Sequence, residues 1–411
     1  MTARARCCRN CGAVVEHVVL DLGEQPLSNS YVDPAALHVP EPHYPLAIGL
    51  CTACWLVQLL DDVDPAMIFT DQYAYFSSVS ESWVAHAHAY AAEMTERLRL
   101  NDDSFVVEIA SNDGYLLGAF VDRGIGVLGI EPSANTAAAA EARGVPTRVE
   151  FFGSALATSL RADGVRPELV VGNNVLAHVR DLDDFVRGLA ILVGDGLLTM
   201  EFPHLLRLVE GLAFDTIYHE HYSYFSLLTA RDVFERRGLD VVDVEELPTH
   251  GGSLRVHVRT RGRTDVSDRV HRLVEQERAA GLDTTTAYDA FASDVERIRE
   301  ELPLFLRAAR ADDRLVVGYG APAKGNTLLN SCGVTSELLP FTVDRSPVKQ
   351  GMLLPGSHVP IESPERLLER RPDYVLVLPW NLVDEITEQM RAVREWGGQF
   401  VVPIPRPHVV V

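Results

Sequence analysis

The densest group of chemically capable side chains lies between residues 215 and 226, where the sequence reads D-T-I-Y-H-E-H-Y-S-Y-F-S. Tyr218, His219, Glu220 and His221 follow one another, and each can hold, move or orient a proton. Histidine is the side chain whose ordinary pKa lies near neutrality, so the segment suggests a proton-transfer site. The plainer alternative is a half-buried strand or loop with satisfied histidines.

Four cysteines near the N-terminus have the spacing of a metal site. Cys8 and Cys11 form one C-x2-C pair, and Cys51 and Cys54 form a second. Each pair presents two thiolates from one turn, and two such turns close a tetrahedral site that needs no water ligand. We therefore expect a structural zinc ion held by all four, with redox-active or free thiols as the alternative. Cys7 lies beside Cys8 but lacks the spacing to Cys11.

The composition is that of an ordinary globular chain. Its 411 residues are 47% hydrophobic and 23% charged, which predicts two to three domains, each with its own core. A net charge of −21 disfavours a nucleic-acid partner, because phosphate backbones are bound by clustered Lys and Arg. The sequence contains neither a signal-peptide pattern nor an apolar run long enough for a bilayer, so we expect a cytoplasmic protein without a membrane partner. We expect a monomer or a weak homo-oligomer.

Residues 105–200 alternate short apolar runs with helical runs, which predicts a doubly wound parallel sheet. Ligands bind such sheets at the carboxyl ends of the strands, where an acid accepts hydrogen bonds from ribose hydroxyls. The turn after the first strand, S-N-D-G, has one glycine instead of G-x-G-x-x-G, which favours a cofactor with a ribose but no phosphate. S-adenosylmethionine is the obvious candidate. The contacts expected for it are Glu108, Ala110, Asn112, Gly114, Glu131, Asn173 and Asn174.

Several downstream elements should meet at the same edge of this sheet. His178 follows the predicted strand 168–172, and the segment 215–226 follows the strand 196–201 and a short helix. The segment can therefore lie over the cofactor edge. The runs 239–247 and 253–259 predict an antiparallel hairpin that closes the sheet.

A second α/β unit begins at Arg314 after the charged, helical stretch 265–311, which we interpret as a connection between lobes. Its first strand leads into G-Y-G-A-P-A-K-G, a turn with the form of a phosphate-binding loop in which Lys324 supplies a counter-charge. Arg345 and Lys349 follow the next strand, which ends in Asp344, and both can face a diphosphate. NAD is the rival ligand for this unit.

Seven motifs, taken in order, resemble the bacterial sugar C-methyltransferases that act on dTDP-linked 4-keto-deoxysugars. They are C-R-N-C-G with C-T-A-C, Y-A-Y-F-S-S-V-S-E-S-W, E-I-A-S-N-D-G, N-N-V-L-A-H-V, Y-H-E-H-Y-S-Y-F-S, T-H-G-G-S-L-R and G-Y-G-A-P-A-K-G-N-T. The resemblance covers nearly the whole chain. It implies an α/β protein with a zinc-binding module (1–68), a Rossmann-like S-adenosylmethionine domain (69–264, of which 69–104 form a leading linker and helix) and a second Rossmann-like, nucleotide-sugar-binding domain (265–411). Substrate contacts are then expected at Tyr73, Ser77, Lys324, Asn326, Arg345 and Lys349.

The resemblance also implies a reaction, a methyl transfer to a ring carbon next to a C4 ketone, with C3 favoured over C5, in deoxysugar or antibiotic biosynthesis. Removing that proton requires a base, for which the resemblance points to His221, with Glu220 to orient it. Tyr218 and His178 are candidates to donate to the C4 oxygen.

Three alternatives remain open from the sequence. If the segment 215–226 is extended, His219 and His221 point the same way and could form a metal pair. An NAD-dependent nucleotide-sugar oxidoreductase or epimerase would use the second α/β unit instead. The third alternative is a catalytically inactive scaffold protein that binds zinc and S-adenosylmethionine.

Overall fold

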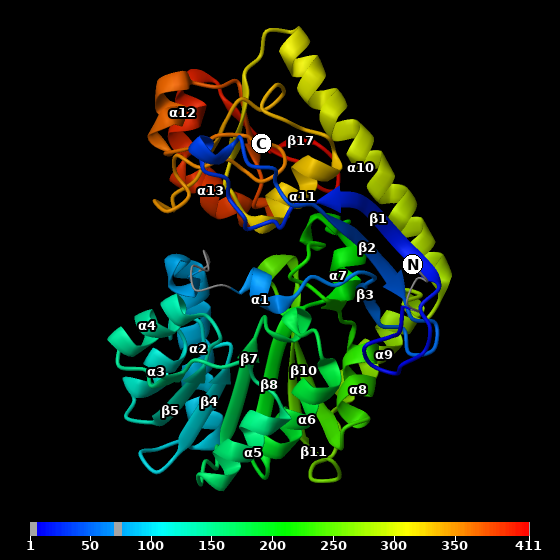
Figure 1. Cartoon of the computed structure of the whole chain (residues 1–411), viewed down its shortest axis with the longest axis vertical. Helices are drawn as coiled ribbons and strands as arrows, with labels where there is room; N and C mark the ends of the chain where they lie inside the picture. Colours follow the sequence, from blue (N-terminus) through cyan, green and yellow to red (C-terminus); the bar gives the residue numbers. More distant parts are fainter. Residues whose placement is uncertain (1–5, 70–75, 411) are drawn as a thin grey trace.

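Three β-sheets organise the computed structural model, which describes residues 6–69 and 76–410 (Figure 1). The fold is mixed α/β, as the sequence predicts, with a cysteine-bearing N-terminal sheet, a central Rossmann-like sheet and a second C-terminal sheet. Across the described ranges, every helix is too short or too polar to cross a lipid bilayer.

The central sheet has seven strands, and only β11 runs antiparallel to its neighbours. In spatial order the strands are β10 (Leu239–Leu247), β11 (Ser253–Thr260), β8 (Leu197–Pro203), β7 (Leu169–Asn173), β4 (Phe105–Ile109), β5 (Gly126–Ile130) and β6 (Thr147–Arg148). The parallel strands are short Val- and Leu-rich runs buried on both faces, as expected for a sheet covered by crossover helices. The predicted hairpin of β10 and β11 is confirmed.

Helices cover both faces of this sheet. They are α2 (Glu81–Leu98), α3 (Leu117–Val121), α4 (Ala134–Ala142), α5 (Ser154–Ala162), α6 (Leu182–Val193) and α8 (Leu227–Glu235). The short helix α7 (Leu205–Glu210) instead packs in the core that contains the N-terminal sheet and α10. The strand order turns back between β4 and β7, so a crevice opens at the carboxyl ends of these two strands. The predicted cofactor residues lie around that point.

The C-terminal sheet has six strands, and α9 (Asp268–Ala279) and the long α10 (Thr285–Ala311) lead to it. In order they are β14 (Ile361–Glu362), β13 (Thr342–Val343), β12 (Val316–Tyr319), β15 (Tyr374–Val377), β16 (Gln399–Val402) and β17 (His408–Val410). Its helices are α11 (Ala323–Ser331), α12 (Glu365–Arg370) and α13 (Val383–Gln389). Figure 1 shows α10 running along one side of the molecule, where it contacts both β1 and β12.

The N-terminal sheet is completed from the centre of the chain. Its order is β1 (His17–Gln25), β2 (Tyr44–Leu50), β3 (Val57–Leu59) and β9 (Ser223–Tyr224), and α1 (Pro65–Ile68) follows β3. The fourth strand thus belongs to the chemically dense segment 215–226. One hydrophobic core joins side chains of this sheet to side chains of α10 and the C-terminal sheet, so these parts pack as one body.

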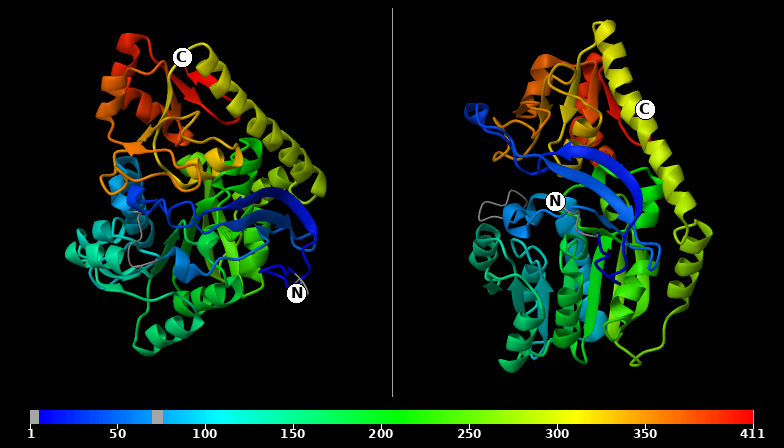
Figure 2. Two further views of the ribbon diagram at one scale, coloured as in Figure 1. Left: turned by 45° about the horizontal axis from the view of Figure 1, so that its top comes forward. Right: turned by 45° about the vertical axis from the view of Figure 1, so that its right-hand side comes forward.

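Residues 26–43, which we call the arm, leave β1 and reach the C-terminal sheet before the chain returns to β2. Val32 and Leu353 exchange two backbone hydrogen bonds of 3.0 and 2.8 Å. Figures 1 and 2 show this blue segment lying against the orange and yellow parts of the C-terminal domain. The arm therefore ties the N-terminal module to the opposite end of the chain.

Candidate active site

A cavity of about 960 Å³ lies where the three sheets meet, and we call it the central cavity. Its walls come from the arm, from the crevice of the central sheet, from the segment 215–226 and from the C-terminal domain. Twelve of the predicted site residues line it: Ser77, Ala110, Asn112, Glu131, Asn173, Asn174, His178, Tyr218, Glu220, His221, Lys324 and Lys349. Tyr73 lies outside the described residues.

The cofactor edge is built by the turn after β4. Ala110 and Asn112 have left-handed backbone angles, with φ of +57° and +48°, which fold the turn back on itself. Both oxygens of the Glu131 carboxylate accept backbone N–H groups, from Asn112 at 3.0 Å and from Ser133 at 2.9 Å. The Asn112 side chain in turn accepts the N–H of Ser77 at 2.8 Å. Burial raises the pKa of the Glu131 carboxyl group, and the hydrogen bonds from these two backbone N–H groups and from the Thr136 and Ser133 side chains oppose that shift.

Two of the predicted cofactor contacts do not line the cavity. Glu108 is fully buried within β4, where burial raises its pKa well above the usual value. Gly114 has φ of +75°, and a Cβ there would lie 3.1 Å from the Cβ of Ala140. The glycine is therefore required by the turn and by packing against α4, because its own position faces protein and not ligand.

The carboxyl end of β7 carries two asparagines that meet other walls of the cavity. Asn173 lies 3.4 Å from the hydroxyl of Tyr115, and the Asn174 amide lies 3.3 Å from Nε2 of His250. His250 also lines the cavity, and burial lowers its pKa to about 4. His250 lies within the T-H-G-G motif, but its residue type and spacing alone did not indicate a place in the site.

His221 has the geometry of a neutral imidazole with a fixed tautomer. Its Nδ1 donates to the carbonyl oxygen of Thr216 at 2.9 Å, and its Nε2 lies 3.0 Å from the hydroxyl of Tyr218. The proton therefore sits on Nδ1 and a lone pair on Nε2. Burial, with the nearby imidazoles of His178 and His250, holds the pKa of His221 well below its usual value. His221 is therefore neutral near pH 7 with a lone pair on Nε2, the form in which an imidazole can accept a proton.

Glu220 does not orient His221, which corrects the prediction. Both ring nitrogens of His221 have other partners, Thr216 and Tyr218. The Glu220 carboxylate instead accepts a 2.5 Å hydrogen bond from the side-chain amide of Asn29, on the arm. No pattern in the sequence indicated that Asn29 would enter this site.

His219 faces away from the central cavity. Its Nε2 donates to the carbonyl oxygen of Tyr44 at 3.3 Å, and its ring packs edge-on against the Tyr44 ring. The chain turns between residues 218 and 221, so His219 and His221 do not point the same way. A metal pair of these two histidines is thereby excluded. Within the described part of the chain, the cysteine cluster is the one group of three or more side chains that could hold a metal.

His178 lies next to His221, with 4.7 Å between the ring centroids. Burial lowers the pKa of His178 to about 4, and a hydrogen bond to the backbone of Glu220 opposes that shift. Phe69 packs edge-on against its other side, with ring centroids 5.8 Å apart. Two neutral imidazoles therefore share one wall of the cavity.

Lys324 brings a positive charge from the C-terminal domain to the cavity wall. Its ammonium lies 4.1 Å from the centroid of the Trp380 ring and contacts the side-chain oxygen of Asn381. Burial lowers the pKa of Lys324 to about 8, and the nearby Asp215 carboxylate opposes this. Burial also raises the pKa of Asp215 to about 6, although the indole of Trp380 donates to it at 2.7 Å. Asp215 links the start of the segment 215–226 to the C-terminal domain.

The other predicted substrate contacts of the C-terminal domain divide into two groups. Lys349 lines the cavity and donates to the carbonyl oxygen of Ala321 at 2.9 Å. Asn326 is buried and donates to the carbonyl oxygen of Ser28 in the arm, and Arg345 is exposed beside Gln389, so neither lines the cavity. These two predicted contacts are corrected accordingly.

The turn G-Y-G-A-P-A-K-G, which has the form of a phosphate-binding loop, packs closely against the protein at Gly320. Gly320 has φ of +88°, and a Cβ there would lie 2.5 Å from Cδ of Pro379. Asp344, at the end of β13, accepts the N–H groups of Ala321 and Ser346 at 2.7 and 2.8 Å, the same arrangement that Glu131 has at the end of β5. No observation in the described residues favours NAD over another ligand.

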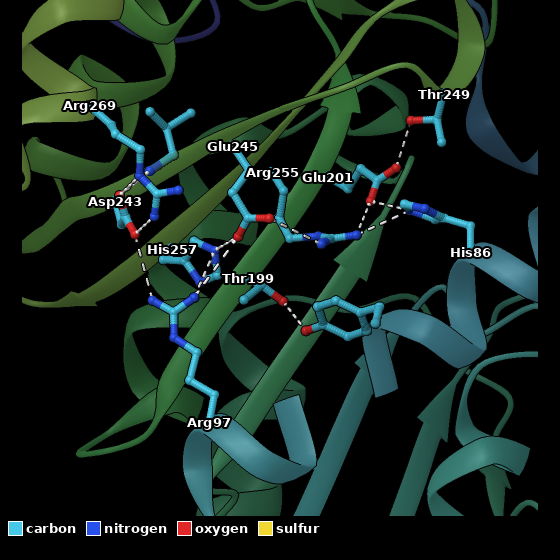
Figure 3. Close-up of polar contacts among 12 residues, drawn as sticks. His86, Arg97, Thr199, Glu201, Asp243, Glu245, Thr249, Arg255, His257 and Arg269 are labelled. Atoms are coloured by element: carbon cyan, nitrogen blue, oxygen red, sulfur yellow. Dashed lines mark hydrogen bonds and ion pairs between the residues drawn. The ribbon is translucent and has the colours of Figure 1, made fainter. Parts of the chain in front are cut away.

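A buried polar network supports the wall of the cavity on the side of β8 (Figure 3). The carboxylate of Glu201 accepts from His86 at 2.9 Å, from Arg255 at 2.8 Å and from Thr249 at 2.9 Å. Arg255 also lies 3.6 Å from Glu245. Burial alone would raise the pKa of Glu201, but the His86 hydrogen bond and the Arg255 charge hold it below its usual value. Because His86 and Thr249 line the cavity, this network fixes two segments of its wall.

The four predicted cysteine ligands come together in the N-terminal module. Their sulfur atoms all lie within 4.8 Å of one another, with Cys8 3.5 Å from Cys54 and Cys11 3.5 Å from Cys51. Zinc–sulfur bonds of about 2.3 Å in a tetrahedron place sulfur atoms about 3.8 Å apart. The cluster therefore fits a four-cysteine zinc site that leaves no position open for substrate. Cys7 is exposed and lies outside the cluster.

Known protein families match three parts of this chain. A C-methyltransferase C-terminal domain matches residues 248–405, a methyltransferase domain matches 83–244 and a zinc binding domain matches 8–69. C-methyltransferase NovU from Streptomyces niveus is 36% identical over 405 residues, which are 98% of this chain and 96% of NovU. The chain belongs to the C-methyltransferase family. As a member it takes S-adenosylmethionine as methyl donor, and its four cysteines form the structural zinc site.

Solved methyltransferases are more distant. Magnesium protoporphyrin IX methyltransferase from Synechocystis PCC 6803, with bound SAH, is 16% identical over 43% of this chain and 82% of its own, with a TM-score of 0.35. A SAM-dependent methyltransferase from Anabaena variabilis is 13% identical over 42% of this chain and 84% of its own, also with a TM-score of 0.35. These similarities are too low to bear on the site.

Proposed function

We propose that this C-methyltransferase transfers the methyl group to C3 of a dTDP-linked 4-keto-deoxysugar, in deoxysugar or antibiotic biosynthesis, and that His221 is the base. The observation that carries the proposal is the neutral His221, whose Nε2 lies in a cavity shared by the cofactor edge and the lysine-bearing C-terminal domain. The similarity to NovU over 98% of the chain supports a related substrate.

The mechanism begins with the proton of the carbon next to the C4 ketone. His221 Nε2 takes this proton, and the electron pair of the broken C–H bond forms the enolate, with negative charge on the C4 oxygen. Thr216 keeps Nδ1 protonated and accepts a stronger hydrogen bond once the ring is charged. The Tyr218 hydroxyl leaves Nε2 and donates to the C4 oxygen, a role in which His178 is the second candidate.

S-adenosylmethionine, when bound, supplies a methyl group on a sulfonium that is ready for attack by carbon. We propose that Glu131 accepts its ribose hydroxyls, while Ala110, Asn112, Asn173 and Asn174 surround the rest of the cofactor. At this edge the chain holds the Glu131 carboxylate in place through the backbone N–H groups of Asn112 and Ser133.

For the nucleotide-sugar we propose contacts from Lys324 and Lys349 to the diphosphate and from Ser77 and Tyr73 to the sugar end of the cavity. The lysines supply positive charge on the side of the cavity formed by the C-terminal domain. We also propose that the chain divides functionally into residues 1–68, 69–264 and 265–411. The three parts then carry zinc, the methyl donor and the sugar nucleotide.

The test is to incubate the protein with S-adenosylmethionine and a panel of dTDP-4-keto-deoxysugars and to look for a gain of one methyl group by mass spectrometry. Deuterium exchange at the acceptor carbon, measured without the methyl donor, separates proton removal from methyl transfer. A panel that yields neither methylated product nor exchange would refute the proposed substrate class. Methylation at C5 would refute the choice of C3 alone.

A further inference from the structure

The arm reaches the central cavity through one side chain, Asn29. Asn29 lines the cavity, and its Nδ2 donates to Oε1 of Glu220 at 2.5 Å. Glu220 is 5% exposed, so its carboxylate has few water molecules to accept from and depends on protein donors. A hydrogen bond from an amide to a nearly buried carboxylate fixes the orientation of that carboxylate.

Tyr31, two residues further along the arm, lies beside the Asn29 amide. The Tyr31 hydroxyl has one proton, which it donates to the carbonyl oxygen of Ala321 at 2.6 Å, and its oxygen lies 3.4 Å from Oδ1 of Asn29. The nitrogen end of the Asn29 amide faces Glu220 because an ionised carboxylate can only accept hydrogen bonds. Tyr31 therefore attaches this part of the arm to the C-terminal domain.

Lys349 meets the arm at the same place. Its ammonium also donates to the carbonyl oxygen of Ala321, and it lies 5.1 Å from the centroid of the Tyr31 ring. A chain of contacts thus runs from Lys349 through Tyr31 and Asn29 to Glu220. It begins at a charge of the C-terminal domain and ends next to His221.

We propose that Asn29 is a positioning residue that holds the Glu220 carboxylate toward the reacting sugar. The arm of the zinc module thereby completes the active site and couples it to nucleotide-sugar binding at Lys349. This inference rests on the proposed function, because it takes Glu220 to contact the substrate. It gives the arm a role beyond attachment of one domain to another.

The sharpest test is Asn29→Asp, which keeps the size of the side chain and replaces the amide donor by an acid. At pH 8 two carboxylates face each other, and we expect kcat to fall about tenfold or more, with unchanged affinity for S-adenosylmethionine. As the pH falls toward the range where the introduced carboxyl group at position 29 gains a proton, the acid donates again and kcat recovers. The kcat of the wild-type protein does not rise in that direction. The groups that face this pair are Tyr31, Tyr222 and His178, and, through Tyr31, Lys349 and Asp344.

Glu41→Gln is the matched control. Glu41 also joins the arm to the C-terminal domain, through the N–H of Gly356 at 2.9 Å and His358 at 3.2 Å, but it does not line the cavity. We expect wild-type kcat for this variant. An equal loss in Glu41→Gln and Asn29→Asp would overturn the proposal, since attachment of the arm alone would then explain both.

Crystal structures separate this inference from the proposed function. In Asn29→Asp at pH 8 the Glu220 carboxylate should turn away from position 29, whatever the substrate is. If the carboxylate keeps its place and kcat and its pH profile stay those of the wild type, Asn29 does not position Glu220. A wild-type protein that methylates no 4-keto-sugar, combined with a moved carboxylate in the variant, would overturn the substrate class and leave the positioning role intact.

Discussion

The segment 215–226 has two sides with different tasks, and two neighbouring histidines mark the difference. His221 faces the central cavity, is neutral and has a lone pair on Nε2. His219 faces the N-terminal module and packs against Tyr44. The same residue type, two positions apart, is a candidate base on one side and a packing residue on the other.

The N-terminal module keeps the cavity-facing side of the segment in place. Behind the cavity side, Leu59 donates its N–H to the carbonyl oxygen of Tyr222 at 3.0 Å, and the Tyr222 hydroxyl donates to the carbonyl oxygen of Val63 at 2.6 Å. Residues 223 and 224 pair with β3 as a fourth strand. The zinc module therefore holds the side of the segment that does no chemistry, and this leaves the cavity side free to meet the substrate.

The largest effect is expected from exchanging the base. His221→Gln removes the lone pair that takes the proton, so we expect kcat to fall by about 10²–10⁴-fold while both ligands still bind. His219→Gln is the matched control and should keep kcat within a few-fold of wild type. Steady-state kinetics with calorimetric binding distinguish the two. Similar losses in both variants would mean that the two sides of the segment do not differ as described.

The second prediction concerns the loss of zinc from the N-terminal module. Cys51→Ser leaves three thiolates, so we expect zinc to be lost and the N-terminal sheet to unfold at lower temperature than in the wild type. Because β9 belongs to that sheet, kcat should fall at least several-fold although the cysteines lie outside the cavity. Metal analysis and circular dichroism provide the measurement. Stoichiometric zinc in the variant would contradict the four-cysteine site.

The third prediction concerns pH. The pKa of Lys324 is lowered to about 8, so its positive charge is present below pH 8 and is lost as the pH rises above it. Binding of the nucleotide-sugar should therefore weaken above pH 8, seen as a several-fold rise in KM. Asp215→Asn removes the carboxylate that supports this charge, so the rise should begin at lower pH. A KM that stays constant from pH 7 to 9.5 would remove Lys324 from the diphosphate site.

The smallest effect belongs to a single hydrogen bond behind the segment. Tyr222→Phe removes the hydroxyl that donates to the carbonyl oxygen of Val63 and leaves the ring in the core. We therefore expect the free energy of unfolding to fall by about 1 kcal/mol. The rate of methyl transfer at saturating substrate should stay unchanged. Chemical denaturation and single-turnover kinetics test both statements. A large loss of rate would extend the catalytic side of the segment to Tyr222.

Local patterns in the sequence predicted the elements, the cysteine cluster and twelve of the residues that line the cavity. The strands around S-N-D-G and Glu131 were correct because buried parallel strands are short apolar runs bounded by turns. Glu108, Gly114, Asn326 and Arg345 were misplaced because a motif gives position along the chain, whereas the side chain's direction depends on tertiary packing. Asn29 could not be found, since nothing local relates residue 29 to residue 220.

The pairing of β9 with β3 also bears on the order in which the chain folds. Strands β1, β2 and β3 are complete by residue 59, but their fourth partner begins at residue 223. During synthesis the edge of β3 stays unpaired until more than a hundred and fifty further residues have been added. Contacts between residues so far apart in the sequence form slowly. A fragment that ends near residue 68 would expose this edge and is expected to associate with other chains. Strand β9, which follows shortly after His221, thus makes the folding of the zinc module dependent on the synthesis of the methyltransferase domain.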